Sequence, residues 1–313
     1  MTPPLSVVIP SQRRVDLLRQ CLQALQQHAP ARTEIIVVDD GSRAAVVQRT
    51  AAEFADVRIV RLPESQGFCT AANAGVAAAT APVVELLNDD AVVQAGWAEA
   101  ALVHLERPDV GAVAPLVLVA GSSQPPVVDS AGDRYYVGGV AGKRGHGQPI
   151  APDLLQTGPV FGASGSSAFY RREALLRVGG FPPAFRAYFE DVDLAFRLHR
   201  AGYQIICEPA SRVRHHVGGS YGKPQRRLLE QQSLNEERVF WRNLGPAAVP
   251  HHALVLAAKA LRRWQDGGLA PFVLGRLRIL GELPALVRHR RWLATLGPAA
   301  PPEAWGVERR WWG

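Results

Sequence analysis

Short apolar runs alternate with helical stretches over the first third of the chain, and this alternation restricts the fold more than any other feature. The apolar runs read as buried strands and cover residues 5–9, 34–38, 57–62 and 83–87. Apolar or small residues recur at helical spacing in residues 17–25, 44–54, 67–79 and 97–106. Strands that alternate with helices of about a dozen residues form right-handed βαβ crossovers. The sequence therefore predicts an α/β fold, a mostly parallel sheet with helices on both faces.

The alternation stops after Val113, so the first 115 residues are expected to form a Rossmann-like half. Residues 120–153 are rich in Gly, Ser and Pro, which predicts a long loop or short mixed strands over the ligand-binding edge of the sheet. Regular structure is then expected in a strand at 167–170, helices at 171–178 and 189–201, and strands at 204–207 and 213–216.

Positive charge and tryptophan are concentrated at the C-terminal end of this chain of 313 residues. The formal net charge is +7, and residues 226–313 contain 14 Lys or Arg against 7 Asp or Glu, so the preceding residues are neutral overall. Six of the seven tryptophans lie in the same stretch. This shift in composition predicts a boundary between a domain of residues 1–225 and a basic, Trp-rich helical segment of residues 226–313.

The sequence of the C-terminal segment is compatible with two kinds of contact, one with a membrane and one with protein. Apolar residues at helical spacing in 254–264 and 272–287 are interrupted by arginines such as Arg262, Arg263 and Arg276. Basic faces with Trp nearby suit an anionic membrane surface, and they equally suit helices that pack on the first domain or form a homodimer. The basic residues come with no nucleic-acid motif, so nucleic acid is not an expected partner.

Cysteine spacing and the missing targeting patterns predict a cytoplasmic protein. Cys21, Cys69 and Cys207 are odd in number and lack metal-ligand spacing, so neither disulfides nor a zinc site is expected. The N-terminus enters a strand without the pattern of a signal peptide, and no clean run of about 18 apolar residues could span a bilayer. Lipid binding by the C-terminal segment would place the protein on the inner face of the cytoplasmic membrane.

Carboxylates follow the fourth apolar run, at the edge where open α/β sheets bind ligands. Residues 83–87 lead directly into Asn88, Asp89 and Asp90. Mg²⁺ or Mn²⁺ prefers charged oxygens and usually shares them with substrate phosphate, so this pair could hold a divalent cation. Either acid could instead cap the helix that follows.

A second acidic pair, Asp39 and Asp40, ends the second predicted strand and is followed by Gly41 and Ser42. A carboxylate at this position can accept the N3–H of uracil or thymine, or bind ribose hydroxyls. The same four residues are also ordinary turn chemistry, which favours a purely structural interpretation when the motif stands alone.

Three acids, Glu190, Asp191 and Asp193, open the helix predicted at 189–201. Asp193 and Arg197 have the spacing of an ion pair within one helix. Helical spacing puts Asp191 on the face of Leu194, which should point toward the protein body. A carboxylate at the edge of a buried face is a candidate general base.

Two histidines, His215 and His216, end the last predicted strand and precede Gly218 and Gly219. One of the two imidazoles could complete a metal shell with Asp90, while the glycines allow backbone to approach phosphate closely. An isolated histidine is more often structural or solvent-facing, so the motif alone does not decide.

Taken in order, seven motifs resemble those of the family 2 inverting glycosyltransferases of GT-A fold. They are Val-Val-Ile-Pro-Ser (7–11), Val-Val-Asp-Asp-Gly-Ser (37–42), Gly-Phe-Cys-Thr-Ala-Ala-Asn-Ala-Gly (67–75), Leu-Leu-Asn-Asp-Asp-Ala (86–91), Gly-Gly-Phe (179–181), Glu-Asp-Val-Asp-Leu-Ala-Phe-Arg (190–197) and His-Val-Gly-Gly-Ser (216–220). The resemblance covers about residues 5–220 and is closest to the bacterial rhamnosyl- and galactofuranosyltransferase-like branch. It implies a nucleoside-diphosphate sugar donor, dTDP- or UDP-linked, and a glycan or lipid-linked acceptor in cell-surface polysaccharide or glycolipid synthesis.

The resemblance also implies a role for each matching position. The residues that would bind the nucleotide or donor sugar are Pro10, Asp39, Asp40, Ser42, Asn73 and Asp89. Asp90 and His216 would ligate the divalent cation, Mg²⁺ or Mn²⁺. Asp191 would be the catalytic base, with Glu190 and Asp193 on the acceptor side.

These roles describe one in-line displacement at an anomeric carbon, with inversion. Asp191 would take the proton of an acceptor hydroxyl, and the metal on Asp90 would neutralise charge on the departing diphosphate. Two positions depart from the family pattern: Ser65, where Asn is frequent, and Pro182, where an acid is frequent.

Two other classes compete with this interpretation. A sugar-phosphate nucleotidyltransferase needs a Gly-rich basic loop after the first strand, and residues 10–14 contain no glycine. In a non-catalytic nucleotide-binding or membrane-docking module, the acidic groups would have no chemical role. The products formed from nucleotide sugars would separate the three.

Overall fold

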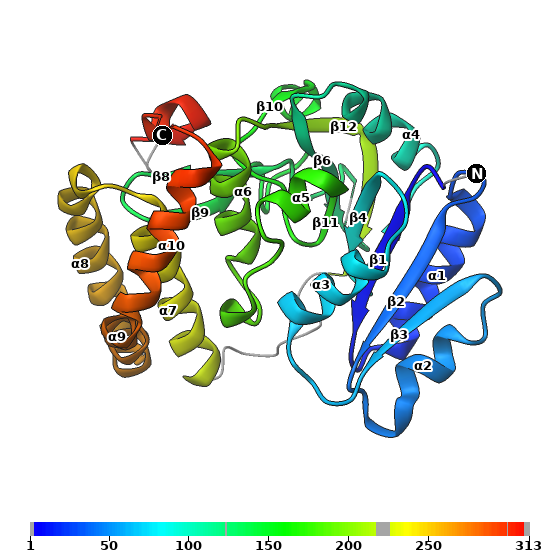
Figure 1. The fold of residues 1–313 in the computed structure, drawn as a ribbon, viewed down its shortest axis with the longest axis horizontal. Coiled ribbons are helices and arrows are strands. Elements are labelled where there is room, and N and C mark those ends of the chain that lie inside the picture. The colour runs from blue at the N-terminus through cyan, green and yellow to red at the C-terminus, as the bar shows by residue number, and fades with distance from the viewer. Residues whose placement is uncertain (1–2, 123, 217–225, 299, 310–313) are drawn as a thin grey trace.

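The computed structural model describes residues 3–122, 124–216, 226–298 and 300–309. Within these residues a ten-stranded sheet has the order β10-β12-β6-β11-β4-β1-β2-β3, with β5 beside β12 and β7 beside β6 (Figure 1). The strands are β1 Ser6–Ser11, β2 Glu34–Asp40, β3 Val57–Leu62, β4 Val83–Leu87, β5 Ala91–Val93, β6 Val110–Val119, β7 Val128–Ser130, β8 Asp133–Tyr136, β9 Val140–Lys143, β10 Gly158–Pro159, β11 Ser167–Arg171, β12 Gln204–His215 and β13 Val307–Glu308. The α-helices are α1 Val15–His28, α2 Val46–Ala51, α3 Phe68–Ala78, α4 Trp97–Leu102, α5 Arg172–Arg177, α6 Glu190–Arg200, α7 Arg226–Asn243, α8 Val249–Gln265, α9 Leu269–Leu277 and α10 Leu283–Leu296. The short 3-10 helices are η1 Arg43–Ala45, η2 Val103–Glu106, η3 Pro152–Leu155, η4 Pro183–Phe185, η5 Pro246–Ala248, η6 Arg278–Glu282 and η7 Pro302–Trp305.

The N-terminal half is the predicted parallel sheet with helices on both faces. β1 pairs in parallel with β2 and β4, and β2 pairs in parallel with β3. Val7 and Ile9 belong to the core under α1, α2 and α4, whereas Val8, the residue between them, belongs to the core under α3, α5 and α6. This alternation follows from the period of two in a strand, so both faces of β1 are apolar and buried. The predicted fold class is confirmed.

In the C-terminal half of the sheet, β5, β6 and β10 were not predicted as strands, and β12 differs from its prediction. Residues 204–207 and 213–216 were predicted as separate strands, but β12 runs unbroken from Gln204 to His215 and pairs in parallel with β6. The register between β12 and β6 shifts between Glu208 and Arg212. Pro209 lies in this shift, and because proline lacks an N–H it interrupts the ladder without ending the strand.

Residues 120–153 form short strands over the sheet edge, one of the two predicted alternatives. β7 pairs with β6, while β8 and β9 form a separate three-stranded sheet with β13. Because β13 comes from the end of the described chain and pairs in parallel with Tyr135 and Tyr136 of β8, this small sheet ties the C-terminal segment to the first domain.

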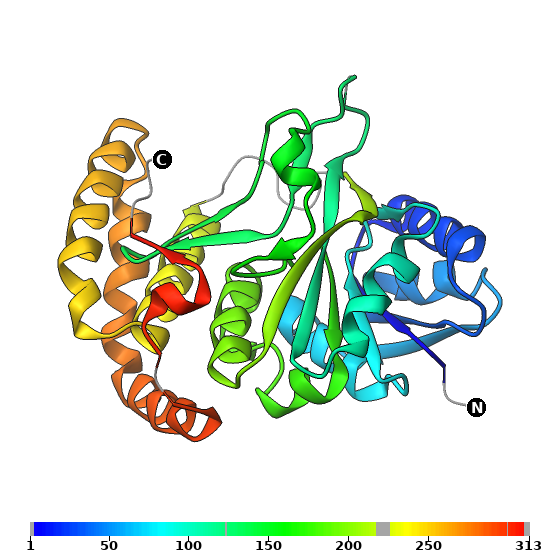
Figure 2. The ribbon, with the colours of Figure 1, turned by 90° about the horizontal axis from the view of Figure 1, so that it is seen from above.

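The C-terminal segment is helical, as expected, and forms one end of the molecule, opposite β1–β3 (Figures 1 and 2). Phe240 of α7, Leu293 of α10 and Val307 of β13 belong to the same apolar core as α3 and α6. The boundary at residue 225 stays a prediction. None of the helices in the described part of the chain is both long and apolar enough to cross a bilayer.

Candidate active site

A cavity of about 1130 Å³ opens at the carboxyl ends of β1, β2 and β4 and at the N-terminal ends of α3, α6 and α7. Five of the residues predicted to act at a site line it: Pro10, Asp40, Asp89, Glu190 and Asp191. Side chains from four distant stretches of sequence therefore share one space.

Asp40 is held by the loop that follows β3. Its Oδ2 accepts hydrogen bonds from the Ser65 hydroxyl at 2.9 Å and the Gly67 N–H at 3.1 Å, and its Oδ1 accepts one from the Gln66 N–H at 2.7 Å. These donors fix the carboxylate at the cavity wall. Ser65, one of the two departures from the family pattern, therefore supports Asp40 directly.

Asp39 and Ser42 lie behind the wall of this cavity. Asp39 is fully buried and accepts hydrogen bonds from the Ser42 N–H at 2.7 Å and the Ser42 hydroxyl at 3.0 Å. The Ser42 hydroxyl in turn accepts the N–H of Val47 at the start of α2. Both residues shape the turn after β2 that presents Asp40.

Asn73 of α3 also lies outside the cavity lining, and its side chain hydrogen-bonds to backbone. Its side-chain amide donates to the Phe181 carbonyl at 2.7 Å, and its Oδ1 accepts the Phe181 N–H at 2.8 Å. This pair of bonds fastens the Gly-Gly-Phe turn to α3.

Asp89 follows β4 and faces the end of β1. Its Oδ2 accepts a hydrogen bond from the Ser11 hydroxyl at 2.6 Å. Burial raises the pKa of Asp89 to about 6, against the effect of the Ser11 hydrogen bond.

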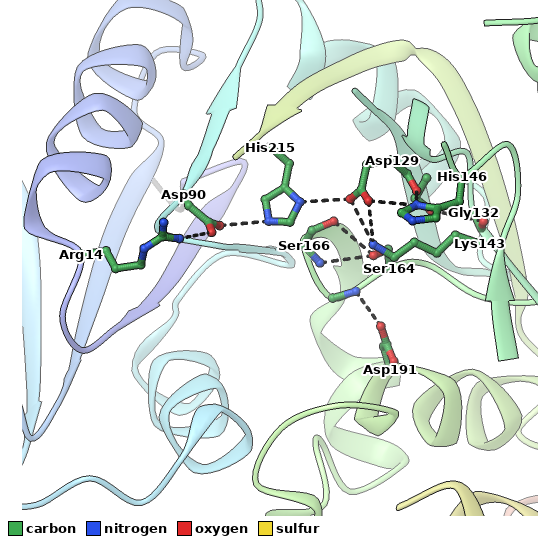
Figure 3. A network of polar contacts seen from close by, with 12 residues as sticks. Arg14, Asp90, Asp129, Gly132, Lys143, His146, Ser164, Ser166, Asp191 and His215 are labelled. Carbon is green, nitrogen blue, oxygen red and sulfur yellow. Dashed lines mark hydrogen bonds and ion pairs between the residues drawn. The ribbon is translucent and has the colours of Figure 1, made fainter. Parts of the chain in front are cut away.

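Asp90 lies between two cationic side chains (Figure 3). Arg14, from the loop after β1, contacts its Oδ2 at 2.6 Å, and Nε2 of His215 lies 3.0 Å from its Oδ1. β5 pairs with the end of β12 so that His215 is opposite Ala91, which brings the imidazole to Asp90. His216, the residue predicted as a metal ligand, meets Asp90 through its backbone, whose N–H donates to the Asp90 carbonyl at 2.9 Å.

Asp129 of β7 holds the other side of the His215 ring (Figure 3). Its Oδ2 lies 3.0 Å from Nδ1 of His215 and 3.0 Å from Nζ of Lys143, and His146 approaches its Oδ1 at 3.3 Å. Burial opposes ionisation of both groups, yet these contacts lower the pKa of Asp129 to about 2 and raise that of His215 to about 9. Asp129 therefore sets the orientation of the imidazole.

The donor set around Asp90 fits a divalent cation that is completed by substrate. Asp90 offers a carboxylate, and His215 presents Nε2 to it because Asp129 occupies Nδ1. No group of three or more His, Cys, Asp or Glu in the described residues is arranged to hold a metal alone. Mg²⁺ and Mn²⁺ sites commonly use one or two protein ligands together with substrate phosphates and water, which matches this arrangement.

Three carboxyl groups gather where α6 begins: Asp133, Glu190 and Asp191, all of which line the cavity. Asp191 accepts the Gly165 N–H at 2.8 Å through Oδ2 and the Val192 N–H at 2.8 Å through Oδ1. Burial, followed by the negative charge of Asp191, raises the pKa of Asp133 and of Glu190 well above the usual carboxyl range.

Asp133 and Glu190 keep hydrogen-bonding capacity for a ligand. Oδ2 of Asp133 and Oε2 of Glu190 are buried without a hydrogen-bond partner among the described residues. A protonated carboxyl group both donates and accepts hydrogen bonds, as a sugar hydroxyl does. The chemistry at the start of α6 therefore suits a polyhydroxylated acceptor.

Asp193 lies apart from this group, although it was expected on the acceptor side. It is fully buried, and its carboxylate is engaged by Arg197 at 2.8 Å and by Arg242 of α7 at 2.7 Å. These contacts make it an anchor between α6 and α7. The helix face that carries Asp193 is covered by α7, so the side chain points into protein and not into the cavity.

Sequence reasoning did not single out four residues that the structure adds to this site: Arg14, Asp129, Asp133 and Lys143. Three of them come from residues 120–153, where the pattern predicted only irregular or short strands. No local signal marks them. A sequence pattern does favour His215 over His216. Val213 and His215 alternate inward along β12, while Arg214 between them is exposed.

Comparison with known proteins identifies the family. Residues 6–179 match the model of glycosyl transferase family 2. The pre-mycofactocin glycosyltransferase of Mycobacterium tuberculosis is 29% identical over 264 residues, which are 83% of this chain and 51% of that protein. The N-acetylglucosaminyl-diphospho-decaprenol L-rhamnosyltransferase of the same organism is 27% identical over 243 residues, 71% of this chain and 79% of that protein.

The fold agrees with a solved glycosyltransferase structure. The crystal structure of GalNAc-T7 with UDP, GalNAc and Mn²⁺ superposes with a TM-score of 0.62 at 17% identity, over 75% of this chain and 48% of that one. This chain spans about half the length of the first relative and of this structure. On the match over residues 6–179, the chain belongs to glycosyl transferase family 2, and its fold is GT-A.

Proposed function

We propose that the protein transfers a sugar from a nucleoside-diphosphate sugar to an acceptor hydroxyl in one displacement, with inversion at the anomeric carbon. The observation that carries this proposal is the shared cavity, lined by Asp40 and Asp89 at the strand ends and by Asp191 at the start of α6. One cavity thus offers a place for the donor beside a candidate base for the acceptor.

The donor side consists of the ends of β1, β2 and β4. Asp40 binds the base or ribose, Asp89 reaches the ribose or sugar, and Pro10 borders the nucleoside. Asp39, Ser42 and Asn73 support this pocket from behind. The structure of GalNAc-T7 with UDP supports a nucleoside diphosphate as the leaving group, and a dTDP- or UDP-linked sugar is our proposal for this chain.

Asp90 and a histidine hold the divalent cation in this proposal, and the Mn²⁺ in the crystal structure of GalNAc-T7 supports it. The contacts of His215 favour it over His216 as the ligand, because its Nε2 lies beside the Asp90 carboxylate. When bound, the cation neutralises charge that develops on the diphosphate as the sugar departs. Arg14, 2.6 Å from Asp90, adds positive charge at the same place.

Asp191 acts as the general base that removes the proton of the acceptor hydroxyl. Its two N–H donors, from Gly165 and Val192, fix the carboxylate while leaving lone pairs on both oxygens. Glu190 and Asp133 orient the acceptor through their unpartnered oxygens. A base held in one orientation at the cavity wall is what proton transfer requires.

The acceptor we propose is a glycan or a lipid-linked sugar in cell-surface polysaccharide or glycolipid synthesis. Support comes from the relative whose name specifies a diphospho-decaprenol-linked substrate. An acceptor of that class would bring the protein to the cytoplasmic face of a membrane.

The test is a panel of nucleotide sugars, first in thermal-shift and then in product assays with Mn²⁺ or Mg²⁺. A donor that binds the native state raises the melting temperature. Release of nucleoside diphosphate would support the proposal. Formation of nucleoside triphosphate and sugar 1-phosphate when pyrophosphate is added would indicate nucleotidyl transfer, and no binding across the panel would contradict a nucleotide-sugar site.

A further inference from the structure

Exposed apolar side chains are concentrated on the C-terminal helices. Apart from Val103, Leu155 and Leu176, every large apolar side chain that the described residues expose lies between residues 249 and 287. They are Val249, Leu254, Leu261, Trp264, Val273, Leu274, Leu277, Leu280, Leu283 and Val287. Exposure reaches 72% for Leu254 and 69% for Trp264, which is costly for a surface that meets only water.

These residues form stripes on neighbouring helices. Leu254, Leu261 and Trp264 recur along the side of α8 opposite His252 and Val255, which are buried. On α9, Val273, Leu274 and Leu277 lie opposite Phe272 and Gly275, which face α7. α8 and α9 contact each other and form the outer end of the molecule (Figures 1 and 2). We call Leu254, Leu261, Trp264, Val273, Leu274 and Leu277 the outer apolar surface.

The helix α9, which carries part of the outer apolar surface, packs on the wall of the active-site cavity. Leu228, Gln231 and Gln232 in the first turns of α7 line that cavity. α9 packs on the same part of α7, so closely that a Cβ at Gly275 would lie 2.2 Å from the carbonyl oxygen of Glu230. The outer apolar surface lies on the side of α9 that faces away from α7, so both α9 and α7 lie between it and the cavity.

The charge around the outer apolar surface is positive. Residues 249–298 contain eight Lys or Arg against two Asp or Glu, and three of these cations, Lys259, Arg276 and Arg278, pair with glutamates of α7. Arg262 and Arg263 flank Trp264 and lie 3.8–3.9 Å from a single acid, Asp266. In α10, Arg288 and Arg291 are exposed and form no ion pair within the described chain. Leu and Trp side chains bordered by arginine are the composition of helices that lie in an anionic membrane interface.

We propose that the outer apolar surface docks on the surface of an anionic lipid bilayer, with α8 and α9 lying against the headgroups. Leucine and tryptophan enter the interface, and the arginines contact lipid phosphates. The bilayer then lies beyond α9 and α7 from the cavity, and a lipid-linked acceptor would present its sugar hydroxyl there by passing around the ends of these helices. Only this last consequence rests on the proposed function; the docking does not.

The test is co-flotation of the full chain with vesicles of phosphatidylcholine alone or phosphatidylcholine with phosphatidylglycerol. The chain should float with the anionic vesicles, less so at high salt because screening weakens arginine–phosphate attraction. The double variant Leu261→Asp/Trp264→Asp should lower the partition coefficient by about tenfold or more, because each change removes an apolar group from the interface. Leu176→Asp on α5, which is 48% exposed and away from this surface, is the matched control and should float like the wild type.

Nucleotide-sugar binding and the melting temperature are measured on the same samples. Unchanged values in the double variant show that it is folded and that its donor site is intact, so failure of docking is separated from failure of the proposed function. The proposal is overturned if the wild type does not float with anionic vesicles, or if both variants float equally. It is also overturned if light scattering shows a dimer that only the double variant dissociates, without change in flotation.

Discussion

Nε2 of His215 lies 3.0 Å from Oδ1 of Asp90, although Asp90 lies between β4 and β5 and His215 ends β12. The contact arises because β5, which follows Asp90 directly, pairs antiparallel with the end of β12. On the other side of the ring, Asp129 accepts Nδ1–H. A carboxylate that orients a histidine toward a second carboxylate is the usual setting of a metal-binding imidazole.

The neighbouring histidines should differ in their effect on metal binding. His215→Ala should weaken Mn²⁺ binding in the presence of a nucleoside diphosphate by about a hundredfold or more, because it removes the nitrogen beside Asp90. His216→Ala should have a much smaller effect, because its backbone N–H to Asp90 is kept. Electron paramagnetic resonance of free Mn²⁺ measures both. The reverse order would restore His216 as the ligand.

Asp129 is expected to act on the metal through His215. Asp129→Asn removes the charge that holds the imidazole and should weaken Mn²⁺ binding by about ten- to a hundredfold. The same titration measures it, and nucleoside-diphosphate binding without metal should change little. His146→Ala is the control, since His146 contacts the other oxygen of Asp129 from an exposed position. Equal losses in the two variants would remove the special role of Asp129.

Asp191→Asn should fold and bind the donor but transfer sugar roughly a hundredfold or more slowly, because the amide cannot take a proton. Its oxygen can still accept the Gly165 N–H, so the loop should stay in place. Glu190→Gln is the matched variant: burial raises the pKa of Glu190 and so favours its uncharged form, which an amide resembles, so this change should cost less activity. Initial rates at saturating donor compare them. Near-normal turnover in Asp191→Asn would refute its role as base.

Asp193→Asn should lower the free energy of unfolding by about 3–5 kcal/mol, because it leaves the buried guanidinium of Arg197 without a counter-charge. Urea denaturation at pH 7 measures this loss. Asp109→Asn serves as control, since its ion pair with Arg107 is exposed and should contribute little. A similar small effect at both positions would show that Asp193 does not anchor α6 to α7.

Glu85 is buried in β4 and accepts hydrogen bonds from Ser167 and Trp97. Because of this group, the free energy of unfolding should fall as pH rises. Burial raises its pKa from 4.5 to about 8, so between these values the folded state binds a proton that the unfolded state has lost. The free energy of unfolding should then fall by about 1.4 kcal/mol per pH unit across that range. Glu85→Gln should remove this slope and be more stable than the wild type at pH 8.

Denaturation curves at pH 5 and pH 8 test the Glu85 prediction. The two proteins should be similar at pH 5, where the wild-type carboxyl group is protonated in the folded state. Parallel losses in both proteins between the two pH values would show that another group is responsible.

The strands β1–β4, most helices and the acids at strand ends could be predicted because each depends on a short stretch of sequence. A buried strand in a parallel sheet needs a continuous apolar run, and the polar residues after it necessarily lie at the sheet edge. For this reason the position of Asp40 and Asp89 at the cavity could be predicted from the sequence alone. Asp191 follows in the same way from the apolar face of α6.

Tertiary structure decided which neighbouring side chain faces the cavity and which is covered. Alternation along β12 puts His215 on the inward face, but the pairing of β5 with β12 is what brings its ring to Asp90. Asp193 and Asp191 begin the same helix, but α7 covers one face and supplies Arg242 to it. Asp129 and Lys143 enter from short strands whose position depends on partners far away in the chain. Such choices depend on long-range packing, for which a local sequence pattern carries no signal.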